Sequence, residues 1–561
     1  MRIGGLMSGM DTEQMVRDLM KVERMKVDRF TTQQTEIEWK QEAYHDVNKT
    51  MANFILNTRQ NFGISSGFGS ANVNNLSWIK SATSSNSAAV SASAQGNAAE
   101  GSHTVEVQNL AETARTTSLQ LTSPDGDALI DKNTGKIDDR FFAEGETEVS
   151  FEMTTSAGTG TITLSKDMNM QDVTRAFNNA VVNEGEPNAG QSLGLRTSYD
   201  AGMDRMMIMS RNSGEKEFMH IDAATDTSGI AGSIFSNAGD QNIFTEVQRN
   251  AEGEILRDAE GNATHGIGGR DATVLFNGEE VKSSNNNVSV FGMDMQLHQI
   301  GETTIQVGTD VDGIYDNIKS FVDEYNELID AVNGPVQEKY DREYGPLTDE
   351  QKEAMNETDI EKWEERARSG LLTNDRTLTR TLQTLRSSMY ENVENAGGEY
   401  NHITQIGIST GNYMQGGRLE IDEDKLKAAI ANDPEGVLDV FFKTPAEGEG
   451  KAGTGLIQRA YDDLTTGMKE VIRQSGPGED SSLYRSVRSN MLIDFVTIQG
   501  SISRLDRDVQ SITQRIATEE RRLMQTEERY WNQFTAMEKA MSQMNDQAGW
   551  LMQQMGGMGM Q

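Results

Sequence analysis

Residues 502–544 read ISRLDRDVQSITQRIATEERRLMQTEERYWNQFTAMEKAMSQM, and an apolar side chain returns there at every seventh position. The same register continues toward the C-terminus, and its members are Ile502, Val509, Ile516, Leu523, Tyr530, Met537, Met544, Leu551 and Met558. A heptad line of this length is typical of a helix that buries a narrow seam against a partner helix. We expect this helix to begin near Tyr484 and to run to about Met555, with Gly500 as a weak point.

The apolar face of this helix changes along its length. Its companion positions are apolar up to Ile512, become polar at Glu519 and Thr526, and turn apolar again one register later from Phe534. A helix with two differently facing stripes contacts two different environments. The pattern therefore predicts a domain boundary around residues 517–529.

The N-terminus carries a second long amphipathic helix, whose apolar line is Phe30, Ile37, Tyr44 and Met51. Asp11 is suited to be its N-cap, with Gln14 completing a capping box, and Gly63 supplies a stop. Two matching terminal helices predict a chain that leaves and re-enters one coiled-coil leg.

Composition excludes several classes of function. The chain has 561 residues, which predicts three or four domains, and a net charge of −36, which disfavours nucleic acid and anionic membrane surfaces. It has no cysteine, so disulfides, thiolate nucleophiles and sulfur-ligated zinc are excluded. No apolar run is long enough for a membrane helix, and residues 1–9 do not resemble a secretory signal.

The middle of the chain is rich in predicted strands. Short apolar runs alternate with turn residues from about residue 76 to residue 311, and Asn277-Gly278 is a strong hairpin turn. Two near-copies, RNAEGE (Arg249–Glu254) and RDAEGN (Arg257–Asn262), are interpreted as successive turns. Helical spacing resumes near Asp312, and further helices are expected at 378–393 and 424–431.

Residues suited to catalysis are scarce. The acidic segment from Asp131 fails as a calcium loop, because the required glycine and bidentate glutamate fall on Lys136 and Phe142. The glycine-rich segment 266–269 lacks the strand–helix pair of a dinucleotide site and is interpreted as a loop. The sequence predicts no catalytic, cofactor-binding or metal site, and a protein that is not an enzyme.

Several motifs carry a family resemblance. The string GLMSGMDT (Gly5–Thr12) and the glutamine-rich helix after it resemble bacterial flagellar filament cap proteins, also called hook-associated protein 2. The stretch YWNQFTAMEKAMSQM (Tyr530–Met544) is similar to the closing helix of that family. Internal stretches agree, namely FVDEYNEL (Phe321–Leu328), WEERARSGLL (Trp363–Leu372), IGIST (Ile406–Thr410), GRLEIDEDKL (Gly417–Leu426) and VFF (440–442). Residues 116–269 match no family.

The resemblance implies an α+β multidomain protein with two nested β-rich domains at the far end. The expected domains are a terminal coiled-coil leg (1–45 with 517–561), a helical bundle (46–75 with 312–516), a β-rich domain (76–115 with 270–311) and an outer variable β-rich domain (116–269). It also implies an extracellular homo-oligomeric ring, commonly of five copies, at the flagellum tip, exported without a cleaved signal peptide. The ring would promote polymerisation of exported flagellin and prevent its loss.

The expected contact residues lie on the two terminal helices. Those expected to touch another subunit or the filament are Leu6, Met10, Val16, Leu19, Phe30, Ile37 and Tyr44. An assembly stripe that a cytoplasmic export chaperone would cover first comprises Tyr530, Phe534, Met537, Met541, Met544 and Leu551, and methionine suits a surface with successive partners. Hook-filament junction proteins are further expected partners. The alternatives are a filament or junction subunit, and an extracellular adhesin that binds host or matrix glycans through residues 116–269.

Overall fold

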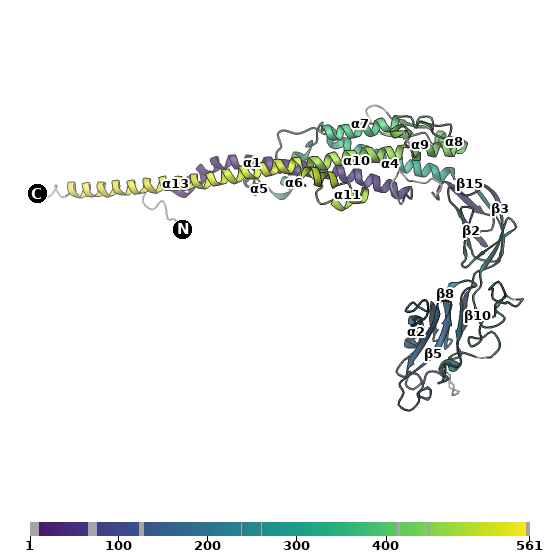
Figure 1. The fold of residues 1–561 in the computed structure, drawn as a ribbon. Coiled ribbons are helices and arrows are strands. Elements are labelled where there is room, and N and C mark those ends of the chain that lie inside the picture. Colours follow the sequence, from purple (N-terminus) through teal and green to yellow (C-terminus); the bar gives the residue numbers. More distant parts are fainter. Residues whose placement is uncertain are drawn as a thin grey trace. The chain divides into compact units, whose positions relative to one another are not determined.

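The computed structural model describes residues 11–64, 76–122, 128–236, 238–259, 261–411, 416–446 and 449–556. The chain forms two compact units, the first combining residues 1–73 with 311–561 and the second spanning residues 74–310. The first unit is mainly helical and the second is built mainly of antiparallel strands (Figure 1). The predicted α+β multidomain class is confirmed, while the four finer domain boundaries stay predictions.

The two longest helices of the first unit come from opposite ends of the chain. Helix α1 spans Thr12–Asn61 and helix α13 spans Arg504–Gly556. At 1.5 Å per residue, each is roughly 75–80 Å long. The other helices are α4 (Val311–Gln337), α5 (Asp349–Glu353), α6 (Glu357–Arg368), α7 (Arg376–Tyr390), α8 (Glu423–Asn432), α9 (Pro434–Phe442), α10 (Leu456–Ser475), α11 (Ser481–Val487) and α12 (Ile493–Gln499). A short ribbon pairs β16 (Ile408–Thr410) with β17 (Leu419–Ile421).

Helix α1 begins and ends where the sequence predicts. The carboxylate of Asp11 accepts a hydrogen bond from the amide of Gln14 at 2.8 Å. The capping box is only half formed, because the side chain of Gln14 donates to Asp18 instead of returning to the cap. Gly63 adopts φ +66°, the left-handed conformation that ends many helices.

The C-terminal helix begins later than predicted. The chain from Tyr484 onward forms α11, α12 and only then α13, so the prediction of one helix from Tyr484 is wrong in its first part. Gly500 and Ser501 both adopt φ +63°, which breaks the helical hydrogen bonds between α12 and α13. Ile502 therefore lies in a connection and not in the helical seam.

Aromatic side chains join α1, α4 and α9 in the core of the helical unit. The rings of Phe54 and Phe321 lie 5.8 Å apart, and those of Phe321 and Phe441 lie 6.1 Å apart. Phe62, just after α1, meets Phe442 edge-on at 4.9 Å. Such ring pairs stabilise beyond the area that they bury. The core thus ties the N-terminal helix to segments more than 250 residues later in the chain.

A buried arginine holds three segments of the helical unit together. Arg459 on α10 is 0% exposed and donates only to backbone carbonyls. The acceptors are the carbonyl oxygens of Ser388, Glu391, Asn392, Lys451 and Ala452. Burial lowers the pKa of this guanidinium, although nearby acidic side chains oppose the shift. Because the last carbonyls of α7 have no helical partner, Arg459 satisfies them and complements the helix dipole.

The second unit contains two β cores. The first β core consists of a five-stranded sheet, in the order β1-β15-β3-β11-β12, and a three-stranded sheet, in the order β13-β14-β2. Its strands are β1 (Lys80–Ser84), β2 (Val90–Ala94), β3 (Gly101–Asn109), β11 (Ala272–Phe276), β12 (Glu279–Ser283), β13 (Asn287–Val290), β14 (Met293–Leu297) and β15 (Gly301–Thr309). Asn277 and Gly278 both have positive φ in the predicted β11–β12 hairpin turn.

The second β core lies within residues 114–243. Its sheets have the orders β10-β9-β5-β6 and β4-β8-β7. The elements are β4 (Thr113–Thr117), β5 (Glu148–Thr155), β6 (Gly158–Ser165), α2 (Met170–Asn179), β7 (Leu195–Asp200), β8 (Arg205–Ser213), β9 (Phe218–Ile221), α3 (Ile230–Ile234) and β10 (Ile267–Gly268). The segment from Asp131 forms turns, as the sequence predicts.

The chain crosses between the two β cores at a tight backbone junction. The carbonyl of Glu112 accepts from the amides of both Gly214 and Arg270, at 3.1 and 3.0 Å. The side chains of Glu112 and Arg270 form an ion pair at 2.6 Å. Gly269 lies against this crossing, where a Cβ atom would meet the carbonyl oxygen of Gly214 at 2.5 Å. A glycine is therefore needed for close approach of the strands.

The two near-copies form two turns with the same hydrogen bonds. In each copy the leading arginine, Arg249 or Arg257, donates to the carbonyl of the glycine four residues later. Gly253 and Gly261 both have φ +85°. This geometry confirms the interpretation as successive turns. Both arginines also reach Glu215, Arg249 at its carbonyl oxygen and Arg257 at its carboxylate.

Candidate assembly surface

Helices α1 and α13 lie side by side and run in opposite directions (Figure 1). At the start of α13, the amide of Gln41 donates to the carboxylate of Asp506 at 2.8 Å. Farther along, Glu23 and Lys26 of α1 line one cleft with residues 519–529 of α13. Since residue numbers fall along α1 while they rise along α13, the pair is antiparallel.

The seam of α13 has the spacing of a coiled coil. Its buried or half-buried side chains are Leu505, Val509, Ile512, Ile516, Glu519, Leu523, Thr526, Tyr530, Phe534, Met537 and Met541. Glu519 in this seam is held by Arg522 at 2.7 Å, beside the cleft that contains Glu23 and Lys26. The seam is therefore polar in its middle and apolar on both sides.

A second apolar stripe on α1 faces away from this seam. It consists of Met15, Leu19, Val22 and Met25, which we call the α1 stripe. Val22 and Met25 are each 66% exposed. The spacing of four, three and three residues places these side chains on one side of the helix. An apolar stripe that the subunit leaves uncovered is suited to contact another molecule.

The last turns of α13 are also uncovered. Every described side chain from residue 543 to residue 552 is exposed, including Met544 at 68% and Leu551 at 53%. We call the apolar members of this segment, Met544, Trp550, Leu551 and Met552, the α13 tip. Four large apolar side chains on ten residues is more than a free helix end needs.

The structure separates the predicted contact residues into groups. Leu6 and Met10 lie outside the described residues. Val16 is buried, Leu19 is exposed on the α1 stripe, and Phe30 and Ile37 are half-buried. The stripe residues Tyr530, Phe534, Met537 and Met541 are half-buried, whereas Met544 and Leu551 are exposed. No finding tests the roles of these residues, so the roles stay predictions.

Tyr44 is engaged inside the subunit. Its hydroxyl donates to the carboxylate of Asp375 at 2.5 Å, and the side chain is buried. Burial, followed by the hydrogen bond and charge of Asp375, raises the pKa of Tyr44 above its ordinary range. Asp375 also caps α7 by accepting from the amides of Thr377 and Leu378. Tyr44 thus fixes α7 on α1, and its ring offers a partner no exposed surface.

Comparison with known families decides the relationship of the chain. The model of the flagellar hook-associated protein 2 N-terminus matches residues 8–114, and that of the C-terminus matches residues 269–546. The two models together cover most of the chain, and both ends are included. The chain belongs to the flagellar hook-associated protein 2 family. Residues 115–268 lie between the two matched regions.

Individual relatives agree with the family models. Flagellar hook-associated protein 2 from Halalkalibacterium halodurans is 29% identical over 584 residues, covering 99% of both chains. The Escherichia coli K12 protein of the same name is 23% identical, covering 98% of this chain and 97% of that protein. Among solved structures, the D1-D2-D3 domains of the Escherichia coli flagellar cap protein FliD match with a TM-score of 0.46 and 21% identity, covering 76% of this chain and 95% of that chain. The hook-associated protein 2 family is thus one of structural flagellar cap proteins.

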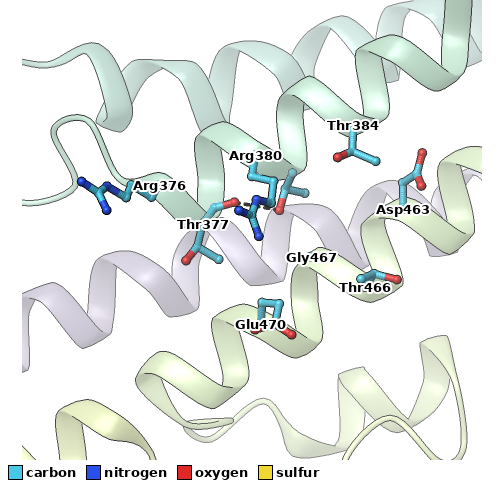
Figure 2. Close-up of a pocket in the computed structure, with 9 residues that line it drawn as sticks. Arg376, Thr377, Arg380, Thr384, Asp463, Thr466, Gly467 and Glu470 are labelled. Carbon is cyan, nitrogen blue, oxygen red and sulfur yellow. Dashed lines mark hydrogen bonds between the residues drawn. The ribbon is translucent and has the colours of Figure 1, made fainter.

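A cleft between α7 and α10 is the other notable hollow in the helical unit. Figure 2 shows Arg376, Arg380 and Thr384 on one wall, and Asp463, Thr466 and Glu470 on the other. Its volume is about 280 Å³. Asp463 already binds Lys451 at 2.7 Å, and Gly467 allows α7 to approach, since a Cβ there would meet Thr381 at 2.4 Å. These groups serve helix packing and form no nucleophile–base pair.

Metal and membrane chemistry find no support among the described residues. Within that part of the chain, no three His, Asp or Glu side chains gather in a way that could hold a metal ion. The search for membrane-spanning helices, limited to the same residues, found none of sufficient length and hydropathy.

Sequence reasoning overlooked part of the exposed apolar surface. Val22 and Trp550 were not among the predicted contact residues, although each is exposed beside one that was. The spacing of Met15, Leu19 and Val22 was a visible signal for the α1 stripe. Trp550 sits outside the heptad line, so a search restricted to that register could not find it.

The contact between α1 and α13 is predicted to depend on pH through Asp506. Burial alone would raise the pKa of Asp506, but hydrogen bonds from Ser503 and Gln41 outweigh burial and lower it below 3.8. A lowered pKa stabilises the fold above the ordinary value, and the effect is lost as pH falls through the lowered one. Asp506→Asn should therefore cost about 1 kcal/mol of unfolding free energy at pH 7 and less near pH ~3.

Thermal unfolding followed by circular dichroism at both pH values measures this difference. Asp508→Asn is the matched control, since Asp508 is exposed on the same helix. An equal loss for Asp506→Asn at the two pH values would contradict the assignment.

Proposed function

We propose that this protein caps the flagellar filament as a homo-oligomeric ring at the tip, outside the cell. The ring promotes polymerisation of exported flagellin and prevents flagellin from being lost. The observation that carries the proposal is the uncovered apolar surface on both terminal helices, in a chain of the flagellar hook-associated protein 2 family.

The exposed stripes give the ring a physical basis. The α1 stripe and the α13 tip together leave eight large apolar side chains partly or mostly in water. At about 25 cal/mol per Å² of apolar surface removed from water, their burial would contribute several kcal/mol. Neighbouring copies, incoming flagellin and the hook-filament junction proteins are the partners that would cover these side chains.

The same surface explains the need for a protective partner before export. Exposed apolar helices associate without specificity when the protein is concentrated. A cytoplasmic export chaperone would cover the stripe from Tyr530 to Leu551 first, and the assembled cap would cover it later. Methionines at three of its six positions suit one surface to two partners, because their side chains adapt their shape.

Two alternatives predict different phenotypes. A filament or junction subunit would share the terminal helices, and an adhesin would bind host or matrix glycans through residues 116–269. Deletion of the gene separates them. Loss of a cap releases monomeric flagellin into the medium and leaves no long filaments, whereas loss of an adhesin alone leaves filaments intact. Normal filaments in the deletion strain would overturn the proposed function.

Charge placed on the α13 tip should abolish assembly without unfolding the subunit. We expect Met544→Asp with Leu551→Asp to remove chaperone binding and motility, because both carboxylates would have to be buried in the interface. The melting temperature of the monomer should stay within about 1 °C of wild type, since both side chains are exposed. Swimming assays and pull-down with the chaperone measure the effect.

A matched control adds the same charge to the same helix outside the apolar stripe. Gln543→Asp with Gln547→Asp changes two exposed polar side chains of α13. This variant should keep motility. If both variants swim like wild type, the α13 tip makes no contact that matters for capping.

A further inference from the structure

One face of the second β core carries an unusual set of side chains. Strands β4, β8 and β7 lie in that order, and Met209 of β8 pairs with Arg115 on one side and Arg196 on the other. Arg211 follows two residues after Met209 and lies on the same face, because side chains alternate along a strand. All three arginines are exposed. We call this surface the arginine face.

The charges on the arginine face are not balanced by neighbours. Among the described residues, Arg115, Arg196 and Arg211 enter no ion pair, and Arg211 donates only to backbone carbonyls. Asp200 is the one carboxylate at this face of the three strands, and it lies at the end, paired in register with Arg205. Cross-strand neighbours in a sheet commonly have opposite charges. This exception stands in a chain with 87 acidic and 51 basic residues.

The centre of the arginine face is apolar. Met209 is half-buried between the arginines, Met207 is 36% exposed, and Leu119 continues the line of β4 at 39%. Arginine and methionine are enriched in the centres of protein–protein interfaces, whereas lysine and glutamate are depleted. An apolar centre with guanidinium groups around it fits a protein surface that carries carboxylates.

The chain itself offers such a surface. Glu144, Glu146 and Glu148 lie within five residues, all are exposed, and none of them enters an ion pair among the described residues. Other carboxylates of this core are already used, as Asp167 binds Lys136 at 2.5 Å and Glu254 binds Lys282 at 2.7 Å. Copies with a net charge of −36 repel one another unless complementary patches meet.

We propose that the arginine face of one copy binds the Glu144–Glu148 segment of the neighbouring copy. This proposal rests on the ring described under the proposed function. Because two different surfaces meet, the contact is head-to-tail, and such contacts close into rings when the rotation permits. The contact orients neighbouring copies and reduces the repulsion between them.

Charge reversal in the full-length chain tests the pairing. Arg115→Glu with Arg196→Glu should lower the association constant of the oligomer at least about tenfold, because like charges then face each other. Lys132→Glu with Lys216→Glu is the control, since it makes the same charge change at exposed lysines outside β4, β7 and β8. Glu146→Arg with Glu148→Arg should weaken association similarly, and the two reversed pairs combined should restore it. Sedimentation analysis and electron microscopy give the readout.

Each outcome decides between explanations. If the arginine variant associates like the lysine control, or if the combined variant is not restored, the proposed contact is wrong. Normal association together with loss of binding to a heparin column would assign the arginine face to an anionic glycan instead. Failure of the proposed function has a different signature, since the wild-type chain would then not restore filaments to a deletion strain.

Discussion

Arg459→Met is expected to destabilise the helical unit by about 4 kcal/mol or more, one of the largest effects of a single substitution in this chain. Arg459 is 0% exposed and donates to five backbone carbonyls from three segments of chain. Methionine keeps most of the volume but leaves those carbonyls without a donor. Each buried carbonyl that loses its partner costs about 1–3 kcal/mol, and the costs are not additive.

Thermal and chemical unfolding of the full chain would measure the loss. Arg459→Lys should recover only a part, because an ammonium group has three donors and lacks the planar fork of arginine. Arg473→Met on the same helix is the control, since Arg473 contacts only Glu470 near the surface and should change stability by less than about 0.5 kcal/mol. Equal melting of the Arg459 and Arg473 variants would contradict this role for Arg459.

The long helices could be predicted because periodicity reports local structure. Asp11 and Gly63 fixed the ends of α1 by capping chemistry that depends on neighbouring residues only. The break before α13 was different. The apolar spacing continues through Gly500 and Ser501, so the pattern predicted a continuous helix, whereas both residues adopt φ +63°. Phe495 packs into the core from α12, a tertiary contact that spacing does not reveal.

The site could be predicted only where its chemistry is local. Tyr44 shares the heptad line of Phe30 and Ile37, yet its hydroxyl binds Asp375, 331 positions later in the chain. No sequence pattern announces that pairing. The arginine face was missed for a similar reason, because Arg115, Arg196 and Arg211 become neighbours only in the strand order β4-β8-β7. Composition predicted an acidic protein and gave no sign of a basic surface within it.

The glycine-rich segment 266–269 shows how a simple interpretation can hide a constraint. The sequence predicted a loop there, and only Ile267–Gly268 forms a short strand. In the structure the segment passes between packed backbones. A Cβ at Gly268 would meet the side chain of Ile255 at 2.4 Å, and one at Gly266 would meet the carbonyl oxygen of Thr245 at 2.6 Å. Close packing, rather than flexibility, explains why glycine occupies these positions.

Gly269→Ala is therefore expected to be strongly destabilising although it adds a single methyl group. The new Cβ would lie 2.5 Å from the carbonyl oxygen of Gly214 and 2.8 Å from that of Glu112. Both obstacles are backbone atoms, so no rotation of a side chain can relieve the overlap. The strands must separate, which weakens the hydrogen bonds from Gly214 and Arg270 to Glu112. We expect a loss of about 3 kcal/mol in the second unit.

Hydrogen exchange at the junction gives the most direct measurement of this loss. The amides of Gly214 and Arg270 both donate to the carbonyl of Glu112, so their protection should fall more than that of amides inside β5 and β6. Gly232→Ala is the control, because Gly232 sits in helix α3 and a methyl group added there would have no atom within 4 Å. That substitution should be neutral or slightly stabilising. If the two alanine variants exchange and melt alike, the junction relaxes at little cost and does not hold the two β cores together.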